Sequence, residues 1–411
     1  MRNEINDNTG RRTSVLIIIE NLTIPVDRRV WQEARTLRDA GYEVSVICPK
    51  QGEFRAGHET LEGIGIYRYP LREGSGPLSY VLEYLWAFVA QLALAIRVYW
   101  RTKFRVIQAC NPPDTIFLVA VLFKLLGVRF IFDHHDLNPE LYLVKFGRRD
   151  LLYRMVCLAE RLTYRTADVA IATNVSYAQV AMERGSMPPE RVFVVHSTPD
   201  LKDFQIVPPR AELKRGKGLL VLYLGTMGPQ DGVDIFIEAA ARIVRERDDV
   251  SFQIVGGGPE VPRLKRMATE KGLDGVLTFA GVRVGKELAA YLSTADVGVA
   301  PDPKNPMNDK STMNKILEYM AFSKPVVLFD LTEGRRAAAD AALYARPDDP
   351  VDFADRIIDL LDSEPLRRQL GERGRRRIEE FLNWDRDKIQ LLAAYQMALA
   401  EQPSKTESRA D

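Results

Sequence analysis

The segment from residue 295 to residue 335 gathers polar side chains where a helix is predicted to begin. Ser311 and Thr312 stand just before apolar residues that recur at helical spacing. Unbonded N–H groups at a helix start, together with hydroxyl groups, form a binding site for phosphate. Glu318 lies about 10 Å further along the helix axis, where its carboxylate could hold a ribose. The segment therefore predicts a site for a nucleoside diphosphate.

The same spacing also fits an ordinary surface helix. In that alternative Asp309 or Ser311 is the N-cap residue and Glu318 lies in solvent. Spacing alone favours the ordinary helix, so the surrounding sequence has to support the nucleotide site.

Short apolar runs alternate with amphipathic segments along the chain, which is typical of parallel sheets covered by helices on both faces. The runs of strand length in the first half are residues 14–19, 43–48, 64–69, 105–109, 128–133, 168–173 and 191–195, with helical patterns at 29–40, 80–100 and 151–167. In the second half they are residues 219–225, 250–256, 276–281, 296–301, 325–329 and 342–345. We predict an α/β protein with two Rossmann-like, doubly wound domains that face one another across a cleft.

The chain of 411 residues is longer than one hydrophobic core usually serves, which favours two domains. Residues 207–217 are rich in proline and charge and show no periodicity, so they are the predicted linker. The predicted domains are then residues 12–206 and 218–383, and a final helix follows at residues 384–401.

The composition narrows the choice of partners. A formal net charge of +1 gives no overall field for nucleic acid, so no nucleic-acid partner is predicted. Cys48, Cys110 and Cys157 are too few and too widely spaced for a disulfide framework or a metal knuckle. The first residues are polar and lack the apolar core of a signal peptide, which favours a cytoplasmic location.

Residues 308–335, NDKSTMNKILEYMAFSKPVVLFDLTEGR, resemble the signature of the family 4 retaining glycosyltransferases, which have the GT-B architecture. That signature has two glutamates eight positions apart, then a Pro-Val-Val strand and a further glutamate. Glu318 matches the second glutamate and Glu333 the later one. Lys310 replaces the first glutamate, which helps to hold the donor sugar in the family, and Asp309 lies beside it.

The resemblance implies further nucleotide-sugar contacts in the second domain. Three glycines after a strand, Gly256, Gly257 and Gly258, allow the backbone to approach a ligand closely. The nucleobase is expected near residues 282–284. Arg283 would be a partner for phosphate or base, or alternatively a solvated loop cation.

The first turn of that domain, which contains Gly225, departs from the family pattern. Relatives have an arginine and a lysine that clamp the diphosphate, whereas this chain has Thr226 and Asp231. Two positive charges are missing where negative charge develops on the leaving group. We hypothesise that Lys310 supplies part of this charge, and Lys315 is the other nearby cation.

In the first domain, His134, His135 and Asp136 follow a predicted buried strand and are expected at its carboxyl end. The family often has a histidine near the reacting sugar, and His135 with Asp136 aligns best. Asp136 could hold the tautomer of His135. A purely structural histidine pair is one alternative. Metal ligands are another, but no further ligands at suitable spacing support a metal.

Arg28 and Arg29 lie at the start of the first predicted helix, where the helix dipole does not favour cations. They are therefore predicted to contact an anionic acceptor or a donor phosphate. In the alternative they are surface arginines that pair with Glu33 one turn on.

Two helical patterns in the first domain suggest contact with a membrane. Residues 80–100 are unusually apolar, but the unbroken part is too short to span a bilayer, and a core helix is the alternative. Residues 148–165 are basic and amphipathic, which suits anionic lipid headgroups. Peripheral binding at the inner face of the membrane would bring the protein to a lipid-linked acceptor.

The resemblance predicts a glycosyltransferase that moves a sugar from a UDP- or GDP-sugar to a hydroxyl of a carbohydrate or lipid-linked acceptor. The anomeric configuration would be retained, His135, Asp136 and Lys310 would be the catalytic groups, and no metal or other cofactor is expected. The last helix is expected to return to the first domain. Two alternatives remain, a sugar-nucleotide epimerase of the same architecture and a non-catalytic relative that binds nucleotide or a partner enzyme.

Overall fold

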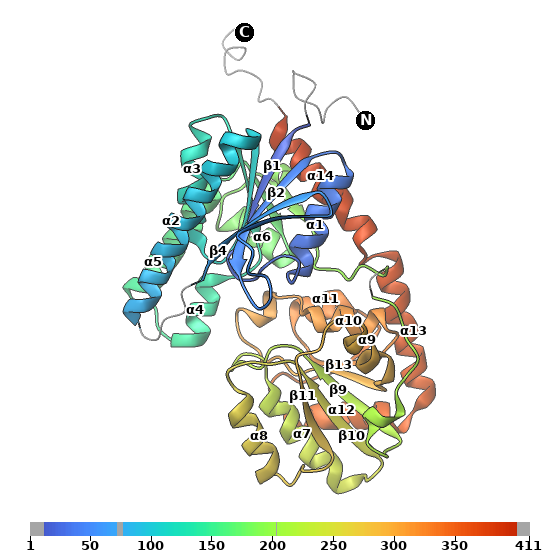
Figure 1. Ribbon diagram of the computed structural model, residues 1–411. Coiled ribbons are helices and arrows are strands. Elements are labelled where there is room, and N and C mark those ends of the chain that lie inside the picture. The colour runs from blue at the N-terminus through green and yellow to red at the C-terminus, as the bar shows by residue number, and fades with distance from the viewer. Residues whose placement is uncertain (1–11, 72–76, 203, 401–411) are drawn as a thin grey trace, which may run out of the picture. The chain divides into compact units, whose positions relative to one another are not determined.

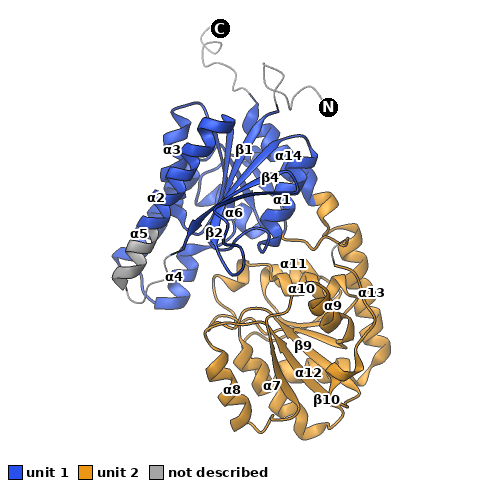
Figure 2. Cartoon of the chain, in the orientation of Figure 1, with its two compact units in different colours: residues 1–196, 387–411 blue, residues 197–386 orange. Residues whose placement is uncertain are grey.

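The computed structural model describes residues 12–71, 77–202 and 204–400 (Figure 1). The chain forms two compact units (Figure 2): unit 1 comprises residues 1–196 and 387–411, and unit 2 comprises residues 197–386. The predicted linker, residues 207–217, lies within unit 2, ten residues beyond the point at which the units divide.

Unit 1 is built on an eight-stranded sheet with the order β3-β4-β2-β1-β5-β6-β7-β8. The strands are parallel except for the antiparallel pair β3–β4. Their bounds are β1 (Ser14–Ile18), β2 (Glu43–Lys50), β3 (His58–Leu61), β4 (Ile64–Pro70), β5 (Val106–Cys110), β6 (Arg129–His134), β7 (Val169–Ala172) and β8 (Val192–Val194). The central strands β1, β5 and β7 are buried along their whole length, as expected where helices cover both faces.

The helices of unit 1 follow these strands in the alternating order that a doubly wound sheet requires. They are α1 (Arg28–Asp39), α2 (Pro77–Thr102), α3 (Phe117–Lys124), α4 (Asn138–Phe146), α5 (Leu151–Thr166) and α6 (Val175–Glu183). None of the described helices of the chain combines the length and the apolarity that crossing a bilayer requires.

Unit 2 has a six-stranded parallel sheet with the order β11-β10-β9-β12-β13-β14. Its strands are β9 (Leu219–Leu224), β10 (Val250–Val255), β11 (Leu277–Gly281), β12 (Val297–Ala300), β13 (Val326–Phe329) and β14 (Ala342–Ala345). Its helices are α7 (Val233–Glu246), α8 (Val261–Glu270), α9 (Gly285–Thr294), α10 (Asn314–Ala321), α11 (Thr332–Ala338), α12 (Pro350–Asp362) and α13 (Glu364–Glu380).

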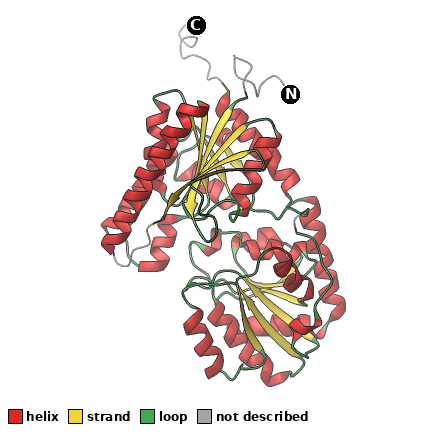
Figure 3. Cartoon of the chain, in the orientation of Figure 1, coloured by secondary structure: helices red, strands yellow, loops and turns green. Residues whose placement is uncertain are grey.

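Alternate residues of β9 serve two different cores of unit 2. Val221 and Tyr223 pack with α7 and α12, whereas Leu222 and Leu224 pack with α9 and α10. Figure 3 shows helices on both faces of each sheet. The predicted α/β class with two doubly wound units is confirmed. The sequence pattern did not predict β3 as a strand. Three of its four residues are polar or charged, and the strand alternates between exposed and half-buried positions.

The last helix, α14 (Trp384–Leu399), begins at the end of unit 2 and belongs to unit 1 from Asp387 onward. Its Tyr395 is fully buried, and its ring lies 5.7 Å from that of Tyr42. The Tyr395 hydroxyl donates a 2.6 Å hydrogen bond to Oε1 of Gln108 on β5. The last helix is therefore part of the core of unit 1.

Gln108 joins α14 to two buried carboxyl groups. Its Nε2 donates to Glu33 Oε2 at 2.6 Å and to Asp133 Oδ2 at 2.8 Å. Glu33 and Asp133 are both fully buried, so the two groups compete to remain ionised. Burial, and then the like charge of Asp133, raise the pKa of Glu33 to about 8. Glu33 is therefore largely protonated at neutral pH.

This buried carboxyl group makes the stability of unit 1 depend on pH. The pKa of Glu33 rises from 4.5 in the unfolded chain to about 8 in the fold, so its stabilising contribution is complete below pH 4.5. That contribution is lost as the pH rises through 8. Across this range, we expect the free energy of unfolding of Glu33→Gln to increase relative to that of the wild type, because only the wild type loses the contribution of Glu33. The gain should be on the order of a few kcal/mol.

Urea unfolding of both proteins at intervals from pH 5 to pH 9 measures this difference. Glu270→Gln on the exposed face of α8 is the control and should follow the wild type at each pH. Parallel pH profiles for Glu33→Gln and the wild type would contradict the assignment of a protonated carboxyl group.

Candidate functional site

In unit 1, one asparagine organises the loops that follow β5 and β6. Asn111 Oδ1 accepts hydrogen bonds from the backbone N–H groups of His135, at 2.7 Å, and Asp136, at 3.1 Å. Its Nδ2 donates to Asp114 Oδ1 at 2.8 Å and to the Asp136 carbonyl at 2.7 Å. The amide thus fixes the backbone of residues 135 and 136 at the carboxyl end of β6, where ligands bind to parallel sheets.

His135 is held by an aspartate that the sequence pattern did not single out. Its Nε2 lies 2.9 Å from Oδ2 of Asp133, and the His135 side chain is 16% exposed. Residues two apart in an extended chain project to the same side, which brings Asp133 and His135 together. The predicted orienting partner, Asp136, lies at the alternate position. Burial raises the pKa of Asp136.

His134 has a structural environment. It is fully buried between Phe132 and Tyr177, with ring centroids 5.3 and 5.0 Å away. Its Nδ1 lies 2.7 Å from the hydroxyl of Tyr164. Burial lowers the pKa of His134 to about 3, so the ring is neutral. The structural alternative therefore describes His134, whereas His135 is partly exposed.

Arg28 and Arg29 have different environments although they are adjacent at the start of α1. Arg28 is exposed, whereas Arg29 is buried. The Arg29 guanidinium lies 3.1 Å from Glu33 and 3.1 Å from Asp133, and it donates to the Val195 carbonyl at 2.7 Å. Arg29 therefore pairs with Glu33, as in the alternative, but it does so inside the protein. Its contacts with protein groups make it part of the scaffold.

Cys110, Asp133 and His135 place three possible metal ligand atoms within 4.8 Å of one another. The Arg29 guanidinium is bonded to Asp133, and its Nε lies 3.1 Å from Nε2 of His135. A positive charge therefore already lies against two of the three ligand atoms. These residues do not fit a divalent ion, because its charge would be repelled at this distance.

In unit 2, the glycine loops that follow β9 and β10 lie directly against each other. Gly256 has a φ of +144°, and a Cβ atom there would lie 1.8 Å from the Gly225 carbonyl oxygen. A Cβ atom on Gly258 would lie 2.4 Å from the Met227 carbonyl oxygen. In Gly257 the nearest atom to such a Cβ is a side-chain methyl of Val282, at 3.1 Å. Two of the three predicted glycines therefore allow the loops to pack on each other.

The first turn of unit 2 supplies no positive charge at the two positions that differ from the family pattern. Thr226 is exposed, and its carbonyl accepts a 2.6 Å hydrogen bond from Tyr223. Asp231 Oδ2 accepts a 2.7 Å hydrogen bond from the Gly228 N–H and so closes the turn. Burial raises the pKa of Asp231, and the charge of Lys315 opposes that rise.

Lys315 is the cation that lies beneath this turn. It is 7% exposed, and its Nζ lies 2.7 Å from Asp302 Oδ1 and 4.8 Å from the centre of the Tyr223 ring. Its Cε is 3.2 Å from the position of a Cβ atom on Gly225. Asp302 is 2% exposed, so the ion pair is buried. Lys315 thus carries a largely neutralised charge close to the Gly225 loop.

The helix α10 begins at Asn314 with Met313 as its N-cap, and no side chain caps it. The prediction that Asp309 or Ser311 caps this helix is therefore wrong. Ser311 Oγ instead donates to the Met307 carbonyl at 2.8 Å. The Ile316 N–H donates to the Met313 carbonyl at 3.0 Å, and a helix start without a capping side chain suits an anionic ligand.

Asp309 instead serves the next helix. Its carboxylate accepts hydrogen bonds from the N–H and the hydroxyl of Thr332 at 3.0 and 2.9 Å, where α11 begins. Thr312 donates to Glu333 at 3.3 Å, and Glu333 is also paired with Arg336. The loop before α10 is thus anchored to α11, which fixes the position of the α10 start.

The remaining predicted residues differ in exposure. Glu318 lies on α10 and is 5% exposed, which excludes the alternative of a solvated side chain. Lys310 is half-buried in a short 3₁₀ turn (Asn308–Lys310). Arg283 is exposed and flanked by Val282 and Val284, whose exposed fractions are 67% and 73%. Exposed valines in a loop are suited to contact the flat face of a base.

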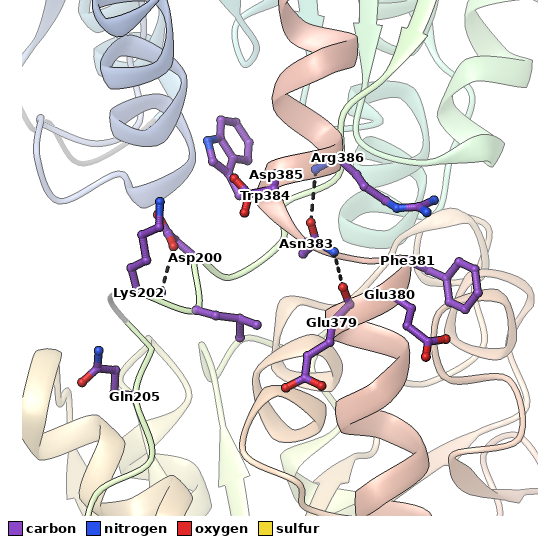
Figure 4. Close-up of a pocket in the computed structure, with 11 residues that line it drawn as sticks. Asp200, Lys202, Gln205, Glu379, Glu380, Phe381, Asn383, Trp384, Asp385 and Arg386 are labelled. Carbon is purple, nitrogen blue, oxygen red and sulfur yellow. Dashed lines mark hydrogen bonds between the residues drawn. The ribbon is translucent and has the colours of Figure 1, made fainter.

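A separate pocket of unit 2 is formed by the two segments of the chain at the ends of this unit (Figure 4). Lys202 N–H donates to Asp200 Oδ1 at 2.9 Å, and Asn383 accepts from the Arg386 N–H at 3.1 Å. These groups bond within their own segments, and none is among the predicted site residues. The pocket is lined by Asp200, Leu201, Lys202, Gln205, Glu379, Glu380, Phe381, Asn383, Trp384, Asp385 and Arg386.

Comparison with known proteins links this geometry to one family. Residues 26–198 match the model of the "Glycosyl transferase 4-like domain", and residues 218–363 match that of "Glycosyl transferases group 1". Over 222 residues the chain is 28% identical to the alpha-D-kanosaminyltransferase of Streptomyces kanamyceticus, covering 52% of this chain and 56% of the relative. The chain spans little more than half the length of the first curated relatives.

Solved structures share the fold over nearly the whole chain. The sucrose-phosphate synthase of Thermosynechococcus elongatus is similar with a TM-score of 0.80 and 20% identity, covering 94% of this chain and 98% of that protein. The Anabaena protein HepE, solved in complex with UDP-glucose, has a TM-score of 0.72 and 16% identity, with coverage of 94% and 100%. At such identities the likeness shows the fold. Because the two family models match one unit each, and the solved structures share the architecture, the chain belongs to the GT-B glycosyltransferases of the family 4 type.

Proposed function

We propose that the protein transfers a sugar from a nucleotide sugar, a UDP- or GDP-sugar, to an acceptor hydroxyl with retention of anomeric configuration. The observation that carries the proposal is the start of α10. Its first N–H groups have no capping side chain, Ser311 and Thr312 precede it, and Glu318 lies further along the same helix. The diphosphate would bind at the helix start and the ribose at Glu318.

The other contacts follow from the loops of unit 2. Gly257 and the α10 start would border the diphosphate, and Val282 with Val284 would contact the base. Arg283 would bind phosphate or base from the same exposed loop. In unit 1, His135 would contact the reacting sugar, as the family resemblance implies. Asp309 is occupied by Thr332, so we assign it a supporting role.

The charge on the departing diphosphate needs a positive partner. Lys315 is paired with Asp302 at 2.7 Å, so its charge is already balanced within the protein. Lys310 lies in the turn just before α10, and we assign it the interaction with the diphosphate. Electrostatic stabilisation of this kind commonly contributes several kcal/mol to catalysis.

A non-catalytic nucleotide-binding role is the second candidate function. Thr226 and Asp231 favour it, because neither supplies a cation to the diphosphate and Asp231 is committed to closing its own turn. Binding would then occur without turnover. Measurements of donor binding and of donor turnover, made on the same preparation, separate the two functions.

The acceptor side of the proposal includes a membrane surface on unit 1. The helix α3 packs against both α2 and α5 (Figure 1), and all three carry outward-facing apolar stripes. The exposed members are Leu85, Val89, Ile96 and Trp100 on α2, Leu118, Val121, Leu122 and the adjacent Leu125 and Leu126 on α3, and Leu151, Leu152, Met155 and Leu158 on α5. Exposed apolar side chains on neighbouring helices are typical of a face that contacts a partner or a lipid layer.

Charge on these helices favours an anionic lipid layer as the partner. Among the described side chains of α2, α3 and α5, every exposed charged residue is basic. These residues are Arg97, Arg101, Arg154, Arg161 and Arg165. The one acidic residue described there, Glu160, is buried and paired with Arg184. We therefore propose peripheral binding to an anionic membrane, where a lipid-linked acceptor would be found.

Nucleotide-sugar binding should depend on Glu318. A ligand at 100 times its dissociation constant stabilises the folded protein by about 2.7 kcal/mol. Binding of UDP, GDP and their sugars is therefore measured as a rise in the temperature of thermal unfolding. Glu318→Gln should weaken the selected ligand by about 10- to 100-fold, because a charged hydrogen-bond acceptor is lost. Glu270→Gln on α8 is the control. No stabilisation of the wild type by any of these ligands would contradict the proposed function.

Donor turnover should depend on Lys310. Lys310→Ala should lower the turnover rate by roughly 10- to 1000-fold, because positive charge is removed from the leaving diphosphate. Lys304→Ala, in the same loop and exposed, is the matched control. Released nucleotide is measured for both variants, and equal rates would remove Lys310 from the mechanism.

Membrane binding should require both the exposed arginines and the exposed apolar side chains of α2, α3 and α5. Two double variants test this requirement, Arg154→Glu/Arg161→Glu and Leu125→Ser/Leu151→Ser. Each should lower co-sedimentation with anionic phospholipid vesicles at low salt by at least about tenfold. Arg266→Glu/Arg376→Glu changes the same charge on exposed positions of unit 2 and should bind as the wild type does. A wild type that stays in the supernatant would exclude this partner.

A further inference from the structure

A second partly exposed histidine of unit 1 is paired with a buried aspartate. His196 follows β8 at the carboxyl end of the sheet, outside the motifs of the family signature. Its Nδ1 lies 2.9 Å from Oδ1 of Asp387, and the His196 side chain is 26% exposed. Asp387 is buried in the first part of α14, at the point where that helix joins unit 1. The pair therefore lies entirely within unit 1.

The aspartate determines which ring nitrogen of His196 carries the proton. An ionised carboxylate only accepts hydrogen bonds, so Nδ1 of His196 has to donate to Asp387. When the ring is neutral, Nε2 is then a hydrogen-bond acceptor on the opposite side of the imidazole. Among the described residues, none bonds to this Nε2 atom.

The strand register places His196 at the same end of the sheet as His135. His134 on β6 and Val194 on β8 both pair with Ala172 on β7, so they lie at one level of the sheet. Both histidines follow directly beyond that level. Neighbouring strands are about 4.8 Å apart, so the ends of β6 and β8 are roughly 10 Å apart.

The Arg29 side chain spans the distance between these two strand ends. Its Nε donates to Nε2 of His135 at 3.1 Å, and its Nη1 donates to the Val195 carbonyl at 2.7 Å. One guanidinium thus contacts the ring of His135 and the backbone that leads directly into His196. The two histidines therefore border the same part of the carboxyl edge, which is where ligands bind to parallel sheets.

A fastening of α14 to the sheet is the simpler role for the pair. That helix, however, already has Leu391, Ala394 and Tyr395 fully buried in unit 1. A single partly exposed hydrogen bond adds little to such packing. Fastening also uses only Nδ1 of His196 and makes no use of Nε2, so the two roles can be separated by experiment.

We propose that Nε2 of His196 accepts a hydrogen bond from a hydroxyl group of the acceptor, and that Asp387 is the positioning residue that sets its tautomer. The inference rests on the proposed function for the identity of the ligand, since a glycosyltransferase has to hold the hydroxyl that receives the sugar. A hydroxyl donates to a neutral imidazole, whereas an ionised phosphate oxygen does not. His196 thereby adds an acceptor contact to the sugar contact assigned to His135.

The tautomer and the contact are both read from imidazole signals of the full chain. Long-range ¹H–¹⁵N correlation spectra separate the ring nitrogens of the four histidines, and His196→Asn identifies the signals of His196. We expect Nδ1 to carry the proton when the ring is neutral. Methyl α-D-mannopyranoside and methyl α-D-glucopyranoside, which present uncharged sugar hydroxyls, should shift Nε2 of His196. The exposed His58 on β3 is the internal control and should not shift.

Two variants separate the hydroxyl contact from the fastening of α14. The side-chain nitrogen of asparagine takes the place of Nδ1, so His196→Asn should keep the wild-type midpoint of urea unfolding. It should weaken glycoside binding, measured from backbone amide shifts, about 3- to 10-fold, as for the loss of one neutral hydrogen bond. His196→Gln should show the reverse, a lower urea midpoint and nearly wild-type glycoside binding, because its amide group takes the place of Nε2.

Four results would overturn the proposal. They are a neutral wild-type ring protonated on Nε2, an Nε2 signal that neither glycoside shifts, an Nε2 signal that only inorganic phosphate shifts, and His196→Asn that binds the glycosides as the wild type does. If His196→Asn does not fold, His196→Gln gives the same signal assignment, and the wild-type spectra still decide. The spectra are recorded without donor, so absence of nucleotide-sugar binding would refute the proposed function and leave this measurement intact.

Discussion

The arrangement of unit 1 depends on one buried positive charge shared between two carboxyl groups. Arg29 reaches from the start of α1 to Asp133 on β6 and to the backbone after β8, so one side chain ties the helix α1 to two places on the sheet. Because water is excluded, removing either Arg29 or Asp133 would leave the other charge uncompensated, which typically costs 3–5 kcal/mol in buried pairs. Glu33 avoids this penalty by remaining protonated.

Unit 2 uses a similar device at the equivalent end of its sheet. Lys315 and Asp302 form a buried ion pair at 2.7 Å, and Tyr223 covers it. The glycine loops above this pair can approach one another only because Gly256 has no side chain. In both units, therefore, internal charges and close backbone packing fix the loops at the carboxyl ends of the strands. Those loops are then free to contribute N–H groups and a few side chains to a ligand.

The sequence predicted the sheets because they depend on local periodicity, whereas the burial of Glu318 did not follow from its spacing. It missed what depends on partners distant along the chain. The burial of Arg29 requires Asp133, and the occupation of Asp309 requires Thr332, so neither follows from spacing. Asp133 itself could have been found, because an aspartate two residues before His135 in an extended segment must project to the same side.

The buried hydroxyl of Tyr395 has a consequence for the order in which the protein is made. Gln108 is synthesised long before its hydrogen-bond acceptor site is filled, since Tyr395 follows it by 287 residues. A ribosome-bound chain that ends after the second sheet has a first sheet with an incomplete interior, although all of its strands have emerged. The first unit therefore reaches its final form only after Tyr395 has emerged, and a premature stop before Tyr395 would damage the half of the molecule translated earliest.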